Sequence, residues 1–175
     1  MKTRFKVALL LTLWPAVAAL ADDVKRYPLP NGNQFPIAQA VEVSAGTTLI
    51  FHSGTVPSPK DPKAAAGSGD YWGDTRTQAM SVFNTLKASL DEKGLGFGDV
   101  IKMTAFLVGD PAKQGRMDFQ GFMDAYTQFF GTSSQPNLPA RSAVQVAALA
   151  QPGIMVEVEV ILARPPAKTG AKHKP

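Results

Sequence analysis

The sequence predicts an α+β sandwich in which two helices cover one face of one mixed β-sheet. Three observations indicate this class. β-forming runs occupy both halves of the chain, two apolar stripes have helical spacing, and the elements follow the order β-β-α-β-α-β-β without an internal repeat. The sheet face that the helices leave open must be either solvated or buried against another subunit.

The N-terminal part predicts an arm followed by two strands. Residues 24–36 are expected to be irregular because their three prolines cannot donate to a β-ladder. The β-rich runs 39–44 and 47–53 are separated only by Ala45-Gly46, which predicts a hairpin. Residues 55–70 are rich in Pro, Lys, Gly and Ala and are expected to form a surface loop.

Two amphipathic helices follow. The first is expected to be capped by Asp74 or Thr75 and to end at Gly94, and the second spans residues 118–130 and ends at Gly131. Each carries an apolar stripe at spacings of three and four, which predicts burial in the core. The stripes consist of Ala79, Val82, Phe83, Leu86 and Leu90 in the first helix and Phe119, Phe122, Met123, Tyr126, Phe129 and Phe130 in the second.

Three further strands complete the predicted sheet. Residues 99–108 form a mixed run that is typical of a strand covered on both faces. Residues 141–147 and 156–161 alternate in polarity. Glu157 and Glu159 share one face of an otherwise Val- and Ile-rich strand, so their position requires an explanation.

The chain divides into four predicted parts. Residues 1–21 have a basic start, an apolar run and a small-x-small end, which predicts a signal peptide; an uncleaved membrane anchor is the alternative. Residues 22–35 form the N-terminal arm, residues 36–163 a single domain, and residues 164–175 a disordered basic tail. We expect a soluble secreted protein without membrane contact after cleavage, periplasmic if its source is a Gram-negative bacterium.

Charge and composition exclude several functions. Residues 22–163 carry 11 basic and 14 acidic side chains, a net charge of −3, because much of the basic excess lies in the signal peptide and the tail. We therefore expect no nucleic-acid binding. The absence of cysteine excludes disulfides and thiol nucleophiles, and His52 and His173 stand too far apart to indicate a metal site.

Arg141 and Glu157 are the candidate functional residues. An arginine at the start of a strand is suited to holding a carboxylate through two parallel hydrogen bonds, although composition alone favours a solvated arginine paired with an acid. A glutamate on an apolar strand could point into a cleft and orient or deprotonate a water. The alternative is an exposed edge whose charges discourage aggregation, and the pattern leaves both readings open.

The chain resembles the Rid (YjgF, L-PSP) family. Residues 140–146 (ARSAVQV) and 156–159 (VEVE) are similar to its C-terminal signature. Residues 36–41 (PIAQAV) and 51–54 (FHSG) resemble its N-terminal signature, and residues 98–104 (GDVIKMT) resemble its central strand. The segments occur in matching order over most of the chain, so the resemblance is more specific than a single motif.

The resemblance implies a fold and a chemistry. Family members have a chorismate-mutase-like α+β fold and form homotrimers with clefts between neighbouring subunits. In the enamine and imine deaminase branch, the arginine at position 141 binds the carboxylate of a small substrate. The glutamate at position 157 supports the water that attacks the imine carbon and yields a 2-keto acid and ammonia. The serine at position 53 lines the same cleft, and no cofactor is needed.

Three pocket positions depart from the pattern of that branch. Ile37 stands where tyrosine is usual, Met123 where asparagine is usual, and Ala143 where cysteine is frequent. An apolar pocket discriminates more weakly than one that hydrogen-bonds its ligand. The departures predict a bulkier or more apolar ligand than 2-aminoacrylate, or weak catalysis.

Three other residues have both a packing and a functional interpretation. Tyr71 and Trp72 could close over the cleft from the long loop, but packing near the start of the first helix is favoured because aromatic rings readily fill cores. His52 follows an apolar strand run and is expected to be a packed, hydrogen-bonded histidine instead of a catalytic base.

Three functions compete. The first is hydrolysis of amino-acid-derived imines, and the second is non-catalytic binding of a small carboxylate by a trimer. The third is ribonuclease activity, which is suggested only by an older label of the family. The net negative charge of residues 22–163 disfavours it, because it gives little attraction for phosphates. The first proposal requires that Arg141 and Glu157 converge on one crevice where two copies meet. Coordinates that place the two groups on opposite sides of the sheet would contradict it.

Overall fold

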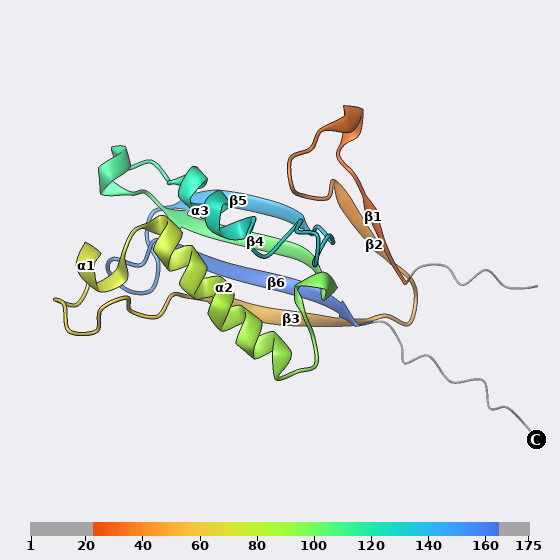
Figure 1. Ribbon diagram of the computed structural model, residues 1–175, viewed down its shortest axis with the longest axis horizontal. Helices are drawn as coiled ribbons and strands as arrows, with labels where there is room; N and C mark the ends of the chain where they lie inside the picture. Colours follow the sequence, from red (N-terminus) through yellow and green to blue (C-terminus); the bar gives the residue numbers. More distant parts are fainter. Residues whose placement is uncertain (1–22, 165–175) are drawn as a thin grey trace, which may run out of the picture.

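The computed structural model describes residues 23–164 and has an α+β architecture (Figure 1). One four-stranded sheet has the strand order β3-β6-β4-β5. The β4–β5 pair is parallel and the other two pairs are antiparallel, so the sheet is mixed, as predicted. Its strands are β3 (Thr48–Thr55), β4 (Val100–Val108), β5 (Ala140–Val146) and β6 (Val156–Arg164). The predicted signal peptide and the tail beyond Arg164 lie outside the described residues.

Two helices cover one face of this sheet (Figure 1). Helix α2 (Thr75–Asp91) begins after Asp74, whose carboxylate accepts a 2.8 Å hydrogen bond from the Thr77 N–H. Helix α3 (Phe119–Tyr126) begins after Asp118 and is shorter than predicted, because a turn follows Tyr126. Both apolar stripes nevertheless pack into the core, as their spacing predicted. Short helical turns are α1 (Gly69–Trp72), η1 (Pro30–Gly32), η2 (Phe97–Asp99) and η3 (Pro111–Lys113).

The strand register assigns each side chain to one of the two sheet faces. Met103, Ala105 and Leu107 of β4 are fully buried against the helices, so their partners in register lie on that same helix-covered face. Phe106 points the opposite way. That open face also carries Phe51, which is 74% exposed, and Val144, which is 42% exposed. A second subunit or solvent must cover the open face.

The N-terminal arm differs from its prediction. Strand β1 (Val24–Tyr27) pairs antiparallel with β2 (Ala40–Val43) in a separate two-stranded sheet, so the predicted β2–β3 hairpin is wrong. The prolines do not prevent β1 because they all follow it in the sequence. The Arg26 guanidinium donates to three backbone carbonyls of the main domain at 2.8–3.0 Å and so fixes the arm there.

Tyr71, Trp72 and His52, for which the sequence allowed either a packing or a functional role, pack against neighbouring groups. The buried Trp72 indole donates to the Pro152 carbonyl at 2.9 Å, and its ring meets Tyr71 edge to face just before α2. His52 is half-buried, with Nε2 2.9 Å from the Ser89 hydroxyl and Nδ1 2.8 Å from the Ser53 carbonyl. Both packing predictions are confirmed.

Candidate functional site

Arg141 lies in an aromatic enclosure on the helix-covered face. It is the second residue of the edge strand β5 and stands opposite Met103, whose side chain is fully buried beneath the helices. Its guanidinium carbon is 4.3 Å from the centroid of the Tyr126 ring. The Phe122, Phe35 and Phe119 rings are 5.4, 5.5 and 5.8 Å away. The four rings line the guanidinium through cation–π contacts.

The guanidinium has a hydrogen-bonding capacity that the chain does not use. Its Nη1 atom is buried and has no partner among residues 23–164, and the ion pairs of this part of the chain do not include Arg141. Burial lowers the pKa of Arg141, and Tyr126 acts in the opposite direction. An arginine nevertheless remains protonated at neutral pH. A buried, charged donor without a partner is costly, and an entering carboxylate would satisfy it.

The local sequence explains how the rings reach Arg141. Phe119, Phe122 and Tyr126 recur at three- and four-residue spacing, so they share one side of α3. Phe35 ends the arm, and Ala38, three residues later, forms a parallel bridge with Ala140, immediately before Arg141. The helical stripe was visible in the sequence, but only as core. The contribution of Phe35 was missed, because no short-range signal links the arm to β5.

Glu157 and Ser53 lie on the other side of the sheet or at its edge. Glu157 stands opposite Phe106 in the β4–β6 register, so it points to the open face, where it is half-buried. Its carboxylate rests against Gly54, at a place that a Cβ atom would occupy. Ser53 is exposed beside Gly54, in the irregular part of the β3–β6 pairing between His52 and Thr55. No local pattern in the sequence marks Gly54 as the neighbour of Glu157.

The positions that depart from the deaminase pattern lie on or beside the elements that surround Arg141. Ala143 follows it by two residues in β5 and therefore shares its face of the sheet. Ile37 is half-buried just after the arm, next to the Ala38–Ala140 bridge. Met123 is 7% exposed in the core on α3, whose neighbouring residue Phe122 faces the guanidinium. The predicted residues thus lie in two regions, one formed by Arg141 and the elements around it and one by Glu157 and Ser53.

The structure does not bring these two groups together within one chain. Arg141 belongs to the helix-covered face and Glu157 to the open face of the same sheet. A single chain therefore has no crevice lined by both. The crevice expected from the sequence lies where two copies meet, so one chain does not test it, but the placement of the two groups on opposite sides of the sheet counts against it. The one arrangement that can still join them places Glu157 of one copy beside Arg141 of another.

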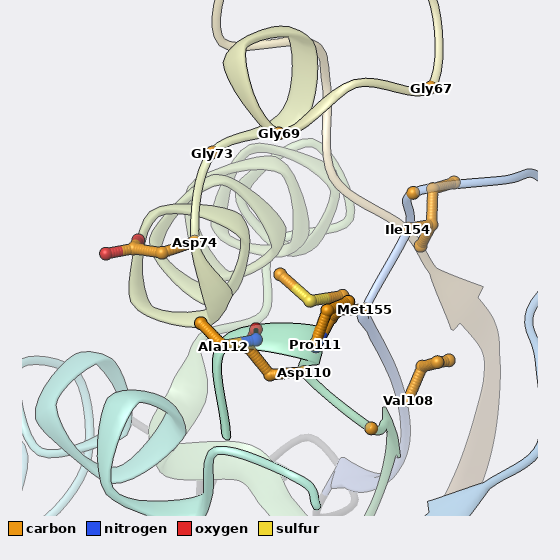
Figure 2. A pocket seen from close by; sticks show the side chains of 12 residues that line it. Gly67, Gly69, Gly73, Asp74, Val108, Asp110, Pro111, Ala112, Ile154 and Met155 are labelled. Carbon is orange, nitrogen blue, oxygen red and sulfur yellow. Dashed lines mark hydrogen bonds between the residues drawn. The ribbon is translucent and has the colours of Figure 1, made fainter. Parts of the chain in front are cut away.

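A separate cavity of about 500 Å³ lies near the start of α2 (Figure 2). Its walls come from the loop before α2, the end of β4 and the turn before β6, and are mainly glycine and aliphatic side chains. Its two carboxylates, Asp74 and Asp110, accept backbone N–H bonds as caps. None of the predicted site residues lines this cavity, so it gives no support to imine chemistry.

Residues 23–164 contain neither a grouped set of metal ligands nor a membrane-spanning helix. Among them, no three His, Cys, Asp or Glu side chains are grouped as a metal site would require. None of the helices in this range is both long and apolar enough to cross a bilayer.

Comparisons with known proteins identify the family. Residues 32–164 match the family described as Endoribonuclease L-PSP. The Escherichia coli (strain K12) protein named "Putative reactive intermediate deaminase TdcF" is 32% identical over 129 residues, which are 74% of this chain and 87% of TdcF. The solved structure of E. coli TdcF with bound serine has a TM-score of 0.51 at 32% identity and covers 80% of this chain and 94% of that one.

A more distant structure supports the fold alone. This is YyfB from Yersinia pestis, a protein of unknown function in the conserved Rid family. It has a TM-score of 0.60 at 20% identity, and the match covers 82% of this chain and all of that one. The family match and the identity to TdcF show that the chain belongs to the Endoribonuclease L-PSP (YjgF/Rid/RutC) family, and the structural similarity shows that it has the α+β fold of that family.

Proposed function

We propose that this protein hydrolyses imines, and the enamines in equilibrium with them, that derive from amino acids, and releases 2-keto acids and ammonia. The observation that carries the proposal is the buried Nη1 of Arg141, which lacks a partner among the described residues. The similarity to TdcF supports the same role, because that protein is named as a reactive intermediate deaminase and was solved with serine, which has a carboxylate, bound.

Arg141 would anchor the substrate. A guanidinium binds a carboxylate through two parallel hydrogen bonds, which fix the direction of the rest of the ligand. The surrounding rings exclude water, so the interaction is stronger than it would be at the surface. Fixing the substrate in this way lowers the entropic part of the barrier to attack on its imine carbon.

Glu157 would act on the water. Its carboxylate accepts a proton as the water oxygen attacks the imine carbon, and this proton passes to the nitrogen. As the C–N bond breaks, the remaining hydroxyl proton also goes to the departing ammonia and leaves the keto oxygen. One water is consumed for each ammonia and keto acid formed, so no cofactor or metal enters the balance. An enamine is first protonated on carbon to give the imine.

The two groups must then come from two copies of the chain. We infer a homotrimer in which Glu157 and Ser53 of one subunit approach Arg141 of the next. The open sheet face supports this arrangement, because it exposes Phe51 and Val144 and also carries Glu157. Burial of such a face against another copy removes apolar area from water.

A complementation experiment tests both the chemistry and the shared cleft. Imines are generated in situ with D-amino-acid oxidase, and keto acid formation is followed in competition with semicarbazide. Arg141→Ala and Glu157→Gln are each expected to be inactive. When the two variants are co-expressed, random assortment should restore roughly a quarter of the wild-type clefts, because each cleft draws one residue from each neighbour. Wild-type turnover equal to that of Arg141→Ala would overturn the proposal.

A matched control is the pair of Arg141→Ala with the double variant Arg141→Ala/Glu157→Gln. Both members of this pair lack Arg141, so their mixed trimers should stay inactive. If mixed trimers form from the first pair without any recovery of activity, Glu157 and Arg141 do not act across a subunit boundary.

Non-catalytic binding is the second candidate. The apolar residues Ile37, Met123 and Ala143 favour it, since they remove polar or reactive groups from the neighbourhood of Arg141. A thermal shift with a panel of keto acids and aromatic acids, lost in Arg141→Ala and unaccompanied by imine turnover, would favour binding over catalysis. Ribonuclease activity is not proposed, because residues 22–163 carry a net charge of −3.

A further inference from the structure

We propose that Phe35 determines specificity at this site and selects 2-imino acids with an aromatic or large aliphatic side chain. The inference rests on the proposed function and names the substrate class. It starts from the difference between Phe35 and the other three rings around Arg141. Phe35 belongs to the arm, whereas the other three belong to α3.

Phe35 is also the exposed ring of the four. It is 39% exposed, whereas Phe122 and Tyr126 are fully buried and Phe119 is half-buried. Its ring stacks on Phe119 at 6.3 Å between centroids and 19° between planes. Phe35 and Phe119 therefore form an aromatic pair at the outer side of the enclosure, where a ligand bound to the guanidinium would extend.

The backbone that carries Phe35 is firmly held. The Phe35 N–H donates to Asn33 Oδ1 at 2.9 Å, and the Ile37 N–H donates to the Phe35 carbonyl at 2.8 Å. The Tyr126 hydroxyl donates to the Pro36 carbonyl at 2.9 Å. A fixed main chain with an exposed ring provides a preformed contact surface, because only the ring torsions need to adjust to a ligand.

Space for a side chain is available beside this ring. Phe35 and Ile37 both line a cavity of about 370 Å³ between the arm and residues 136–138. Phe35 thus lies both near the guanidinium and on a cavity wall.

The chemistry of the two stacked rings, Phe35 and Phe119, sets the preference. Once the carboxylate is anchored at Arg141, an aromatic or branched side chain can pack on the faces of Phe35 and Phe119 and displace water from them. A methyl group is too small to cover both rings. A polar side chain would lose its water without gaining a partner from the rings, so it should be disfavoured.

The test compares two achiral imines that the oxidase makes from D-phenylalanine and D-alanine. We expect wild type to prefer the phenylalanine-derived imine in kcat/KM. Phe35→Ala should lower this preference by about five- to tenfold, mainly through KM for the aromatic substrate. Phe35→Tyr retains the ring and should keep the wild-type ratio. Circular dichroism and thermal melting check that each variant is folded.

Failure of this inference differs from failure of the proposed function. If both imines are hydrolysed and the ratio is the same in Phe35→Ala and wild type, the role of Phe35 is overturned and the hydrolase stands. If neither imine is hydrolysed, thermal shifts with 3-phenylpropanoate and propanoate decide. An aromatic preference that Phe35→Ala removes supports the selectivity of the site, and no preference overturns it.

Discussion

The guanidinium carbon of Arg141 lies 4.3 Å from the centroid of the Tyr126 ring, and the hydroxyl of the same tyrosine donates to the Pro36 carbonyl. Tyr126 thus joins three parts of the molecule: helix α3, the strand that carries Arg141, and the arm that carries Phe35. Burial raises the pKa of Tyr126, so its hydroxyl remains a protonated donor at every pH at which the protein would be studied. One side chain therefore contacts both the Arg141 guanidinium and the arm, which Arg26 also holds.

Tyr126→Phe should separate these two roles. The substitution keeps the ring against Arg141 and removes the hydrogen bond to Pro36, so the free energy of unfolding should fall by about 1 kcal/mol. Because the arm loses a constraint, KM for imines should rise more than kcat falls. Urea denaturation measures the first effect and steady-state kinetics the second. Tyr71→Phe is the control, since no hydrogen bond of the Tyr71 hydroxyl is found among the described residues. Equal stability of Tyr126→Phe and wild type would contradict the role of this hydroxyl.

Much of the fold follows from local patterns. Both helices have apolar stripes, β5 and β6 alternate in polarity, and β3 and β4 are β-rich runs, so these elements can be read directly; Asp74 was a visible cap. The pairing of β2 with β1 instead of β3 could not be read in this way. It depends on long-range bonds from Arg26 that hold the arm against the main domain.

The site was predicted less completely, for a geometric reason. Alternation shows which residues of one strand share a face. Which residues of two different strands share a face depends on the register in which the strands pair. Here Arg141 is in register with Met103 and Glu157 with Phe106, three residues further along the same strand, so the two candidates face opposite ways. The enclosure of Arg141 was also hidden, because Phe119, Phe122 and Tyr126 have the spacing of ordinary core residues.

Phe51→Asp should prevent assembly of the proposed trimer. Phe51 is 74% exposed on the open sheet face, and burying such a side chain contributes about 2–3 kcal/mol in each subunit. Burying an unpaired carboxylate there would instead be unfavourable. Sedimentation velocity should show a trimer for wild type and a single chain for the variant, with loss of imine hydrolysis. Thr85→Asp, on the exposed side of α2, should remain trimeric. A wild-type monomer, or a trimeric Phe51→Asp, would contradict the assignment of this face.

Gln78→Leu should destabilise the fold strongly for its size. Gln78 is fully buried and donates to the Gly73 and Gly153 carbonyls at 3.1 and 3.0 Å, while its Oε1 accepts from the Met155 N–H at 2.7 Å. Leucine fills a similar volume but leaves three backbone groups without this partner. A loss of about 3 kcal/mol in the free energy of unfolding is expected.

The matched control for this change is Gln120→Leu on α3. Gln120 is exposed, and among residues 23–164 its amide bonds only Asp124, at 2.7 Å, so its loss should cost less than about 0.5 kcal/mol. Urea unfolding curves of the two variants should therefore differ clearly in midpoint. If both variants unfold like wild type, Gln78 does not hold the start of α2 to the turn before β6.

Asp74→Ala should reveal a cap whose contribution depends on pH. Hydrogen bonds from the side chain and then the backbone of Thr77 hold the pKa of Asp74 below its usual value, because they favour the ionised carboxylate. A carboxylate with a lowered folded pKa stabilises the protein above its unfolded pKa of about 3.9, and this contribution is lost as the pH falls through the folded value. The free energy of unfolding of wild type should therefore exceed that of Asp74→Ala by about 1 kcal/mol at pH 5–7, and the difference should shrink below about pH 4.

The matched control is Asp74→Asn, which keeps an acceptor for Thr77 without an ionisable group. Its stability advantage over Asp74→Ala should persist in acid. Urea unfolding of the three proteins between pH 3 and pH 7 measures these differences. A wild-type advantage that grows towards low pH would reverse the sign and rule out the ionised cap.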